Sequence, residues 1–203
     1  MCTLIGDIHG NTEMYLNIVA KHERTIQLGD LGFNYEFLNA VDSTKHRVIA
    51  GNHDNYWQMD SYPHFLGDFG ELMLEGLPKI FFCRGGRSID KESRTLGINY
   101  FPEEEFDLRQ CNDAIDAYNG CEVMLSHECP TVVMEQILAS KKDDRNIDPS
   151  VTSHLLQRMF DLHRPNLWVF GHHHKSFTQV IDGCKFVCLN EFETARIQDL
   201  YQH

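Results

Sequence analysis

An α/β fold is the class that this sequence predicts, and two observations support it. Short apolar runs that read as buried strands recur along the chain, with helical patterns between several of them. Five of these runs are each followed directly by a polar cluster, and the clusters are Gly6-Asp7-Ile8-His9-Gly10, Gly29-Asp30, Gly51-Asn52-His53-Asp54, Ser126-His127-Glu128 and Gly171-His172-His173-His174. Because ligands bind beyond the carboxyl ends of strands in open α/β sheets, we expect the five clusters to meet at one site.

The N-terminal part of the chain repeats one unit, in which a strand leads into a polar cluster. Each of the first three clusters follows an expected strand, at residues 2–5, 25–28 and 47–50. A helix is predicted over residues 12–23, because Met14 and Ile18 lie four residues apart on one face and Asn11 can cap the start. A second helix is expected over residues 35–41.

The remaining elements follow the same logic. Further strands are expected at residues 72–74, 79–83, 122–125, 167–170, 177–181 and 185–189. Asp182-Gly183 separates the last two strands and is a strong hairpin signal. Helices are predicted over residues 103–118, whose first turn is acidic, and over residues 148–163, which Pro165 ends.

Length and composition predict a single domain over residues 1–203, with 42% hydrophobic residues and enough chain for a large core. The N-terminus lacks the pattern of a signal peptide, and no apolar stretch is long enough to span a bilayer. Seven cysteines, none in a C-x-x-C pair, are expected to be reduced and mostly buried thiols. These features together predict a cytoplasmic protein with no membrane partner.

The polar clusters contain the donors of a metal site. Three of the side chains offer hard oxygens and four offer imidazole nitrogens: Asp7, Asp30, Asn52, His9, His127, His172 and His174. Seven donors are more than one ion needs and about what two ions need, so we expect two divalent cations that share a bridging carboxylate. Mixed oxygen and imidazole ligands without thiolate favour Mn²⁺, with Fe or Zn²⁺ as alternatives.

The ordered set D-x-H, GD, GNHD, a histidine after a strand, and GHxH resembles the calcineurin-like metallophosphoesterase superfamily over nearly the whole chain. The resemblance implies a four-layer αββα sandwich, in which two mixed β-sheets pack face to face and helices flank them. It also implies two ligand sets that share Asp30: Asp7, His9, Asp30 and His174 for one metal, and Asp30, Asn52, His127 and His172 for the other.

The activity that this resemblance implies is hydrolysis of phosphodiester or small phosphomonoester bonds. Two metals lower the pKa of a bridging water, and the resulting hydroxide attacks phosphorus in line with the leaving oxygen. His53 corresponds to the histidine that protonates the leaving oxygen in the family, so it is assigned as general acid; a loop histidine without a role is the alternative. Phe33 and Asn34 stand where the serine/threonine phosphatase branch has Asp and Arg, and this favours the phosphodiesterase-type branch.

Other residues carry weaker expectations. Arg84, Arg87 and Arg94 surround a Gly-Gly turn and form a candidate substrate clamp, although a solvated basic turn explains them equally well. His173 is expected to point away from both neighbouring ligands, and Asp54 to position its own loop. The net charge of −12 argues against a broad surface for duplex nucleic acid and favours a small or local phosphoester as the partner.

Three alternatives stay open at this point. A nuclease is the first, because Ser126-His127-Glu128-Cys129-Pro130 is similar to a segment of the RNA lariat-debranching branch. A protein serine/threonine phosphatase is the second, and a non-catalytic scaffold like the retromer subunit of this fold is the third. That scaffold lacks the histidine corresponding to His53, which this chain has. The sequence leaves the oligomeric state open.

Overall fold

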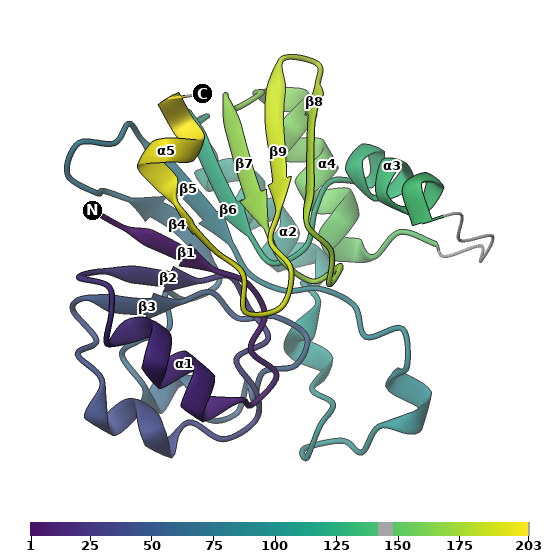
Figure 1. Cartoon of the computed structure of the whole chain (residues 1–203). Coiled ribbons are helices and arrows are strands. Elements are labelled where there is room, and N and C mark those ends of the chain that lie inside the picture. Colours follow the sequence, from purple (N-terminus) through teal and green to yellow (C-terminus); the bar gives the residue numbers. More distant parts are fainter. Residues whose placement is uncertain (142–147, 203) are drawn as a thin grey trace.

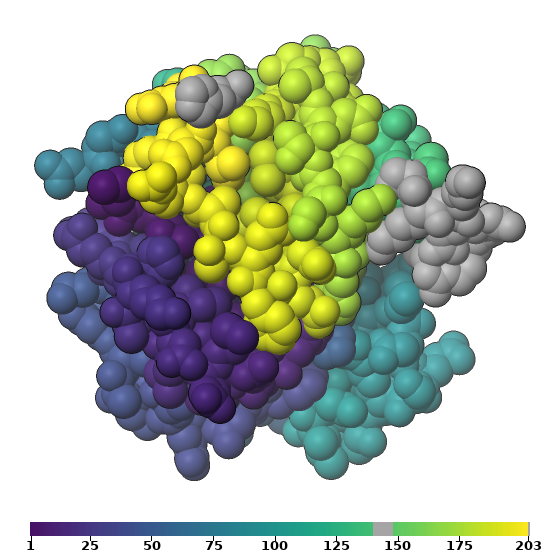
Figure 2. All heavy atoms as spheres, viewed as in Figure 1, coloured from purple at the N-terminus to yellow at the C-terminus, as the bar shows by residue number. Residues whose placement is uncertain are grey.

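Two mixed β-sheets form the centre of the molecule in the computed structural model, which describes residues 1–141 and 148–202 (Figure 1). The four-stranded sheet has the order β10-β1-β2-β3. Its strands β1 (Thr3–Ile5), β2 (Thr25–Gln27) and β3 (His46–Val48) are parallel, and β10 (Thr194–Arg196) pairs antiparallel with β1. The pairing of β10 with β1 brings C-terminal residues against the N-terminal strand, and Figure 2 shows this contact between yellow and purple atoms.

The six-stranded sheet has the order β4-β5-β6-β7-β9-β8. Its members are β4 (Phe69–Leu72), β5 (Ile80–Cys83), β6 (Val123–Ser126), β7 (Leu167–Phe170), β8 (Phe177–Ile181) and β9 (Cys184–Cys188). The four inner strands are parallel, whereas β4 and β8 run antiparallel at the two edges. The inner strands are apolar on both faces, as expected of parallel strands covered on both sides.

Three apolar clusters hold the layers together. One lies between the sheets and joins Leu4 and Ile26 of the small sheet to Val123 and Val169 of the large one. Another packs α2 (Leu108–Ala117), α3 (Thr131–Lys141) and α4 (Val151–Leu162) against the outer face of the large sheet. The third packs α1 (Thr12–Val19) against the small sheet. The predicted αββα sandwich of two mixed sheets with flanking helices is thereby confirmed.

Several element boundaries differ from those predicted. The strand predicted at residues 72–74 lies earlier in the structure, where β4 begins at Phe69 and ends at Leu72. In place of the α-helix predicted over 35–41, the structure has a short 3₁₀ helix, Glu36–Ala40. The helix predicted over 103–118 begins only at Leu108, because Asp107 caps it and forms a capping box with Gln110. Likewise, Ser150 caps α4, which therefore begins at Val151 rather than at 148.

Among the α-helices and strands of the described residues, three were not predicted: α3, β10 and α5 (Ile197–Gln202). The first follows Pro130 and carries apolar residues on more than one side, so it lacks a clear helical period. The strand β10 is only three residues long and is specified by its pairing with β1, which lies at the other end of the chain. Within the described residues, every helix is too short or too polar to cross a bilayer.

Candidate metal centre

The five polar clusters meet at the carboxyl ends of five parallel strands. Clusters from β1, β2 and β3 in the small sheet face those from β6 and β7 in the large sheet. Four of the predicted ligands have left-handed backbone conformations, with φ of +47° at His9, +59° at Asp30, +67° at His172 and +47° at His174. Such values are uncommon for residues with a Cβ atom, and they concentrate at functional sites. The tight turns direct these side chains toward one point between the sheets.

One group of donors consists of Asp7, His9, Asp30 and His174. The Nε2 atoms of His9 and His174 lie 2.8 Å apart. Oδ2 of Asp7 is 3.2 Å from Nε2 of His174, and Oδ2 of Asp30 is 3.6 Å from Nε2 of His9. Oδ2 of Asp7 is buried and accepts no hydrogen bond from the described residues. A buried carboxylate oxygen facing two imidazoles is the arrangement that a cation would satisfy.

The other group consists of Asp30, His127 and His172, and the amide of Asn52 joins it. Nε2 of His127 lies 3.2 Å from Oδ1 of Asp30, 3.1 Å from Oδ1 of Asn52 and 3.1 Å from Nδ1 of His172. Asp30 therefore belongs to both groups, with Oδ2 facing the first and Oδ1 facing the second. All seven predicted ligands are brought together, in the two sets that the resemblance implied.

Hydrogen bonds on the outer side of these imidazoles determine which ring nitrogen faces the centre. Nδ1 of His127 donates to the carbonyl of Leu28, and Nε2 of His172 donates to Oε2 of Glu128. The remaining nitrogens, Nε2 of His127 and Nδ1 of His172, face each other with lone pairs. Two such nitrogens at 3.1 Å require a proton or a metal cation between them. The donor set thus fits a divalent metal.

The charges of the site lead to the same conclusion. Burial lowers the pKa of His127, but the carboxylate of Asp30 outweighs burial and raises that pKa to about 10. The pKa of Asp30 is lowered despite its burial, chiefly by His127. Burial likewise opposes ionisation of Asp7, and the nearby imidazoles of His174 and His9 lower the pKa of its carboxyl. Buried carboxylates that hold protons on nearby imidazoles will also attract metal ions, which replace those protons.

Two buried residues brace the ligand loops, and sequence reasoning identified only one of them. Asp54, expected to position its own loop, does more: its carboxylate accepts backbone N–H groups of Asp30, Leu31, Gly32 and Gly51 and the hydroxyl of Tyr35. Burial raises the pKa of Asp54 to about 7, and the nearby Asp30 charge adds to this effect. Gln27, which was not predicted, donates to the carbonyls of Gly6 and Gly29 and so connects the first two loops.

Glu128 is a second residue whose role was missed. Its carboxylate accepts from Nε2 of His172 at 3.2 Å and from Nε2 of His173 at 3.0 Å. His173 is in neither donor group: its Nε2 faces Glu128 and Cys129, and its ring contacts the ring of His172 rather than pointing away from it. Burial disfavours the charged form of Glu128, but these two imidazoles lower its pKa well below the ordinary value. The sequence could have indicated this role, because Glu128 directly follows the proposed ligand His127.

His53 lies beside the candidate centre but is not in either donor group. Its backbone N–H donates to Oδ1 of Asp30 at 2.7 Å, and its ring contacts the ring of His9. The guanidinium of Arg94 donates to Nε2 of His53 at 2.6 Å and also pairs with Asp90. Burial lowers the pKa of His53 to about 4, with Arg94 contributing, so the imidazole is neutral with its proton on Nδ1.

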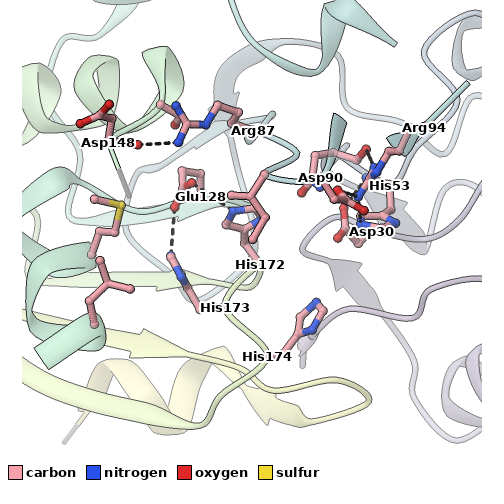
Figure 3. Close-up of a pocket in the computed structure, with 15 residues that line it drawn as sticks. Asp30, His53, Arg87, Asp90, Arg94, Glu128, Asp148, His172, His173 and His174 are labelled. Atoms are coloured by element: carbon pink, nitrogen blue, oxygen red, sulfur yellow. Dashed lines mark hydrogen bonds and ion pairs between the residues drawn. The ribbon is translucent and has the colours of Figure 1, made fainter. Parts of the chain in front are cut away.

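The three arginines predicted as a clamp lie in different surroundings. Arg94 and Arg87 line a cavity of about 410 Å³ that opens from the candidate metal centre, and Arg87 donates to the carbonyl of Asp148. Figure 3 shows Arg94 beside His53 and Arg87 at the opposite side of this cavity. Arg84 is only 2% exposed, pairs with Asp68 and stacks on Tyr56 and Phe106. We therefore correct the expectation for Arg84, which has a structural role away from the cavity lining.

Comparison with solved structures returns proteins of low identity. The phosphopantetheinyl hydrolase PptH of Mycobacterium tuberculosis is 14% identical over 94% of this chain and 90% of its own, with a TM-score of 0.47. The protein TT1561 of Thermus thermophilus is 12% identical over 94% and 89%, with a TM-score of 0.49. Vps29 of Chaetomium thermophilum is 13% identical over 94% and 68%, with a TM-score of 0.41.

Among curated proteins, none matches this sequence significantly. Comparison with protein-family models gives a direct result. The model described as calcineurin-like phosphoesterase matches residues 2–176, and this range contains every ligand of the two donor groups. With the strand-end motifs, the two mixed sheets and the shared Asp30, this match establishes that the chain belongs to the calcineurin-like phosphoesterase family.

Proposed function

We propose that this protein is a metal-dependent phosphoesterase that hydrolyses phosphodiester or small phosphomonoester bonds. One observation carries the proposal: the two donor groups share Asp30, and members of both groups line a single cavity together with His53 and Arg94. A phosphate group placed there would contact cations on one side and a guanidinium on the other. Both are suited to the negative charge that develops during phosphoryl transfer.

Two divalent cations are the proposed cofactors, with Mn²⁺ as the first candidate and Fe or Zn²⁺ as alternatives. Their proposed ligands are Asp7, His9, Asp30 and His174 for one ion and Asp30, Asn52, His127 and His172 for the other. When bound, such ions supply Lewis acidity and lower the pKa of water. The chain itself holds the ligands rigidly and fixes their tautomers through Leu28 and Glu128.

His53 and Arg94 are the proposed contacts for the reacting phosphate. In the structure Arg94 donates to Nε2 of His53, so the imidazole can deliver a proton only after Arg94 turns toward the phosphate. A bound phosphate oxyanion would favour this movement and would raise the pKa of His53. In the proposed reaction a water molecule releases a proton to solvent and its oxygen bonds to phosphorus, the ester P–O bond breaks, the leaving oxygen receives a proton from the His53 imidazolium, and His53 regains a proton from solvent.

The test is a screen of the Mn²⁺-loaded protein with bis(p-nitrophenyl) phosphate, p-nitrophenyl phosphate, cyclic nucleotides and branched RNA. We expect hydrolysis of the diester. Asp30→Asn should abolish activity and metal binding together, because Asp30 belongs to both donor groups. His53→Gln should lower kcat by about 10²–10³-fold and leave the metal content unchanged.

Each outcome of the screen has a clear meaning. Activity on the monoester alone would overturn the preference for diesters, and cleavage of branched RNA would favour the nuclease alternative. Full activity of His53→Gln would contradict its assignment as general acid. Absence of hydrolysis for every ester, with metal below stoichiometry, would favour the scaffold.

We also propose that the protein acts in the cytoplasm as a single domain. The seven cysteines of the described part of the chain are thiols, and six of them are buried. Thiols of this kind fit a reducing compartment. Fluorescence microscopy of the protein fused to a fluorescent tag would test this location.

A further inference from the structure

The cavity beside the candidate metal centre has two chemically different parts. Its polar part is lined by the ligands Asp30, Asn52, His172 and His174 together with His53 and Arg94. The rest of its lining contains three apolar side chains, Ile89, Met134 and Leu138, beside the polar side chains of Arg87, Glu128, Asp148, Ser150 and His173. Figure 3 shows Arg87 and Asp148 on the side of the cavity away from His53 and Arg94. A volume of about 410 Å³ is typical of small-molecule sites and exceeds what one phosphate group would fill.

The apolar part is built from two separate elements. Met134 and Leu138 lie four residues apart on α3, so they present neighbouring side chains on one face of that helix. Met134 is otherwise buried in the core of the helical layer, which fixes its position. Ile89 belongs to the connection between β5 and α2, and its side chain is 63% exposed. A single exposed isoleucine is ordinary, but this one lines a cavity that also contains two buried or half-buried apolar side chains.

We propose that this apolar part binds the organic group of the substrate, so that the enzyme acts on phosphoesters with an apolar body of about the size of a butyl chain or an aromatic ring. The inference rests on the proposed function, because it places the phosphate at the candidate metal centre. Ile89, Met134 and Leu138, here called the apolar wall, line the same cavity as the candidate metal centre and Arg87, so a ligand that fills this cavity covers their side chains. Covering that wall removes apolar surface from water on both molecules.

Specificity follows from this arrangement. Polar esters such as those of glycerol or sugars would place hydroxyl groups against the apolar wall and lose their hydrogen bonds to water. Methyl esters would leave the wall uncovered. Arg87, whose guanidinium already donates to the carbonyl of Asp148, offers its remaining donors to an acceptor at the far end of a longer ligand.

The experiment measures binding directly, with butylphosphonate and methylphosphonate titrated into the Mn²⁺-loaded protein by isothermal calorimetry. Wild-type protein should bind butylphosphonate about tenfold or more tightly than methylphosphonate, because each buried methylene contributes to affinity. Ile89→Ser should reduce this preference to about threefold or less and leave the affinity for methylphosphonate unchanged. Ile98→Ser is the matched control, since Ile98 is 66% exposed in the same connection and does not line the cavity. That variant should retain the wild-type preference.

The outcomes separate this inference from the proposed function. If both phosphonates bind with equal affinity, or if Ile89→Ser and Ile98→Ser behave alike, the apolar subsite is wrong while the phosphoesterase proposal stands. If neither phosphonate binds the metal-loaded protein, the proposed function fails and this inference fails with it. Retention of the preference for butylphosphonate in Ile98→Ser, with its loss in Ile89→Ser, supports the subsite.

Discussion

At the scale of single residues, the carboxylates of this site have different tasks although they lie close together. Asp7 and Asp30 face imidazoles and are available to cations. Asp54 is saturated by five donors and has no free oxygen to offer a metal ion. Glu128 lies on the outer side of His172 and accepts hydrogen bonds from two histidines. The number and kind of hydrogen-bond donors around each carboxylate determine whether it binds a cation or holds a loop.

The role of Asp54 can be tested by Asp54→Asn. The amide nitrogen cannot accept the backbone N–H groups that now bond to one carboxylate oxygen, so buried donors lose their partner. We expect the free energy of unfolding to fall by about 2 kcal/mol and the affinity for metal to fall with it. Chemical denaturation and metal titration measure the two effects.

The control for this variant is Asp42→Asn, because Asp42 also accepts bonds from a neighbouring turn, at Thr44, but lies at the surface. The free energy of unfolding of Asp42→Asn should remain nearly that of the wild type, since water can replace the lost hydrogen bonds. Equal effects at the two positions would show that the bonds to Asp54 have no special importance.

Glu128→Gln tests how the outer hydrogen bonds act on the metal centre. A glutamine oxygen can accept from only one of the two imidazoles, and the tautomer of His172 is then less well fixed. Metal affinity should fall by about 10–100-fold, whereas kcat at saturating metal should largely recover. Glu135→Gln, at an exposed position of α3, is the control. A wild-type metal affinity for Glu128→Gln would contradict the proposed positioning role.

At the scale of elements, the loops that follow the strands determine how the proposed metal ligands converge. A Cβ atom at Gly29 would lie 2.2 Å from Nδ1 of His127, and the backbone there has φ of +104°. A Cβ atom at Gly51 would lie 2.3 Å from Oδ1 of Asp30. The glycines therefore allow the backbone of one ligand loop to approach the side chains of others, which lets donors from two sheets converge.

Gly29→Ala should disrupt the centre for this reason, with loss of metal binding and a large drop in melting temperature. Gly183→Ala provides a matched control: its φ is +85°, yet nothing lies within 4 Å of the added Cβ atom. The control should cost only the backbone strain of about 1–2 kcal/mol. Calorimetry and metal analysis of both variants would decide, and normal metal content in Gly29→Ala would contradict the packing argument.

The elements also show what the sequence could and could not predict. Strands β1, β2 and β5 were located within one or two residues, because each is a short apolar run that ends at a glycine or a polar cluster. All seven proposed ligands could be chosen as candidates for the same reason, and the structure brings them close together. The burial of Arg84 could not be predicted from the sequence, since it depends on Asp68 and Phe106, which only the folded chain brings together. The hydrogen bonds of Gln27 and Glu128 depend on contacts between loops in the same way.

At the scale of the whole molecule, a net charge of −12 coexists with a site that we propose for phosphate. Much of the negative charge at the centre belongs to carboxylates that hold protons on nearby imidazoles when metal is absent, as the raised pKa of His127 shows. Two divalent cations would reverse the local charge and make the cavity attractive to phosphate. Metal loading, pH and stability are thereby linked in one equilibrium.

This linkage predicts how pH acts on metal binding. The pKa of His127 is about 10 in the folded metal-free protein and about 6.5 in the unfolded chain. Its protonated pair with Asp30 thus stabilises the metal-free protein fully below about pH 6.5, and this contribution is lost as pH rises toward 10. A bound metal ion takes the place of this proton, so the metal-loaded protein does not lose this stabilisation as the pH rises.

The increase in melting temperature caused by Mn²⁺ should therefore grow from about pH 6.5 to about 8.5, as differential scanning fluorimetry with and without metal can measure. Asp30→Asn serves as the control and should show no metal-dependent increase at any pH. A metal-induced increase that is constant or declines over this range would contradict the linkage.

The metal content of the purified protein tests the central claim most directly. After equilibration with Mn²⁺ and removal of the excess, elemental analysis of the wild-type chain should give two ions per chain, and Asp30→Asn should give none or a substoichiometric amount. A wild-type chain that holds one ion or none under these conditions would contradict a dinuclear centre bridged by Asp30.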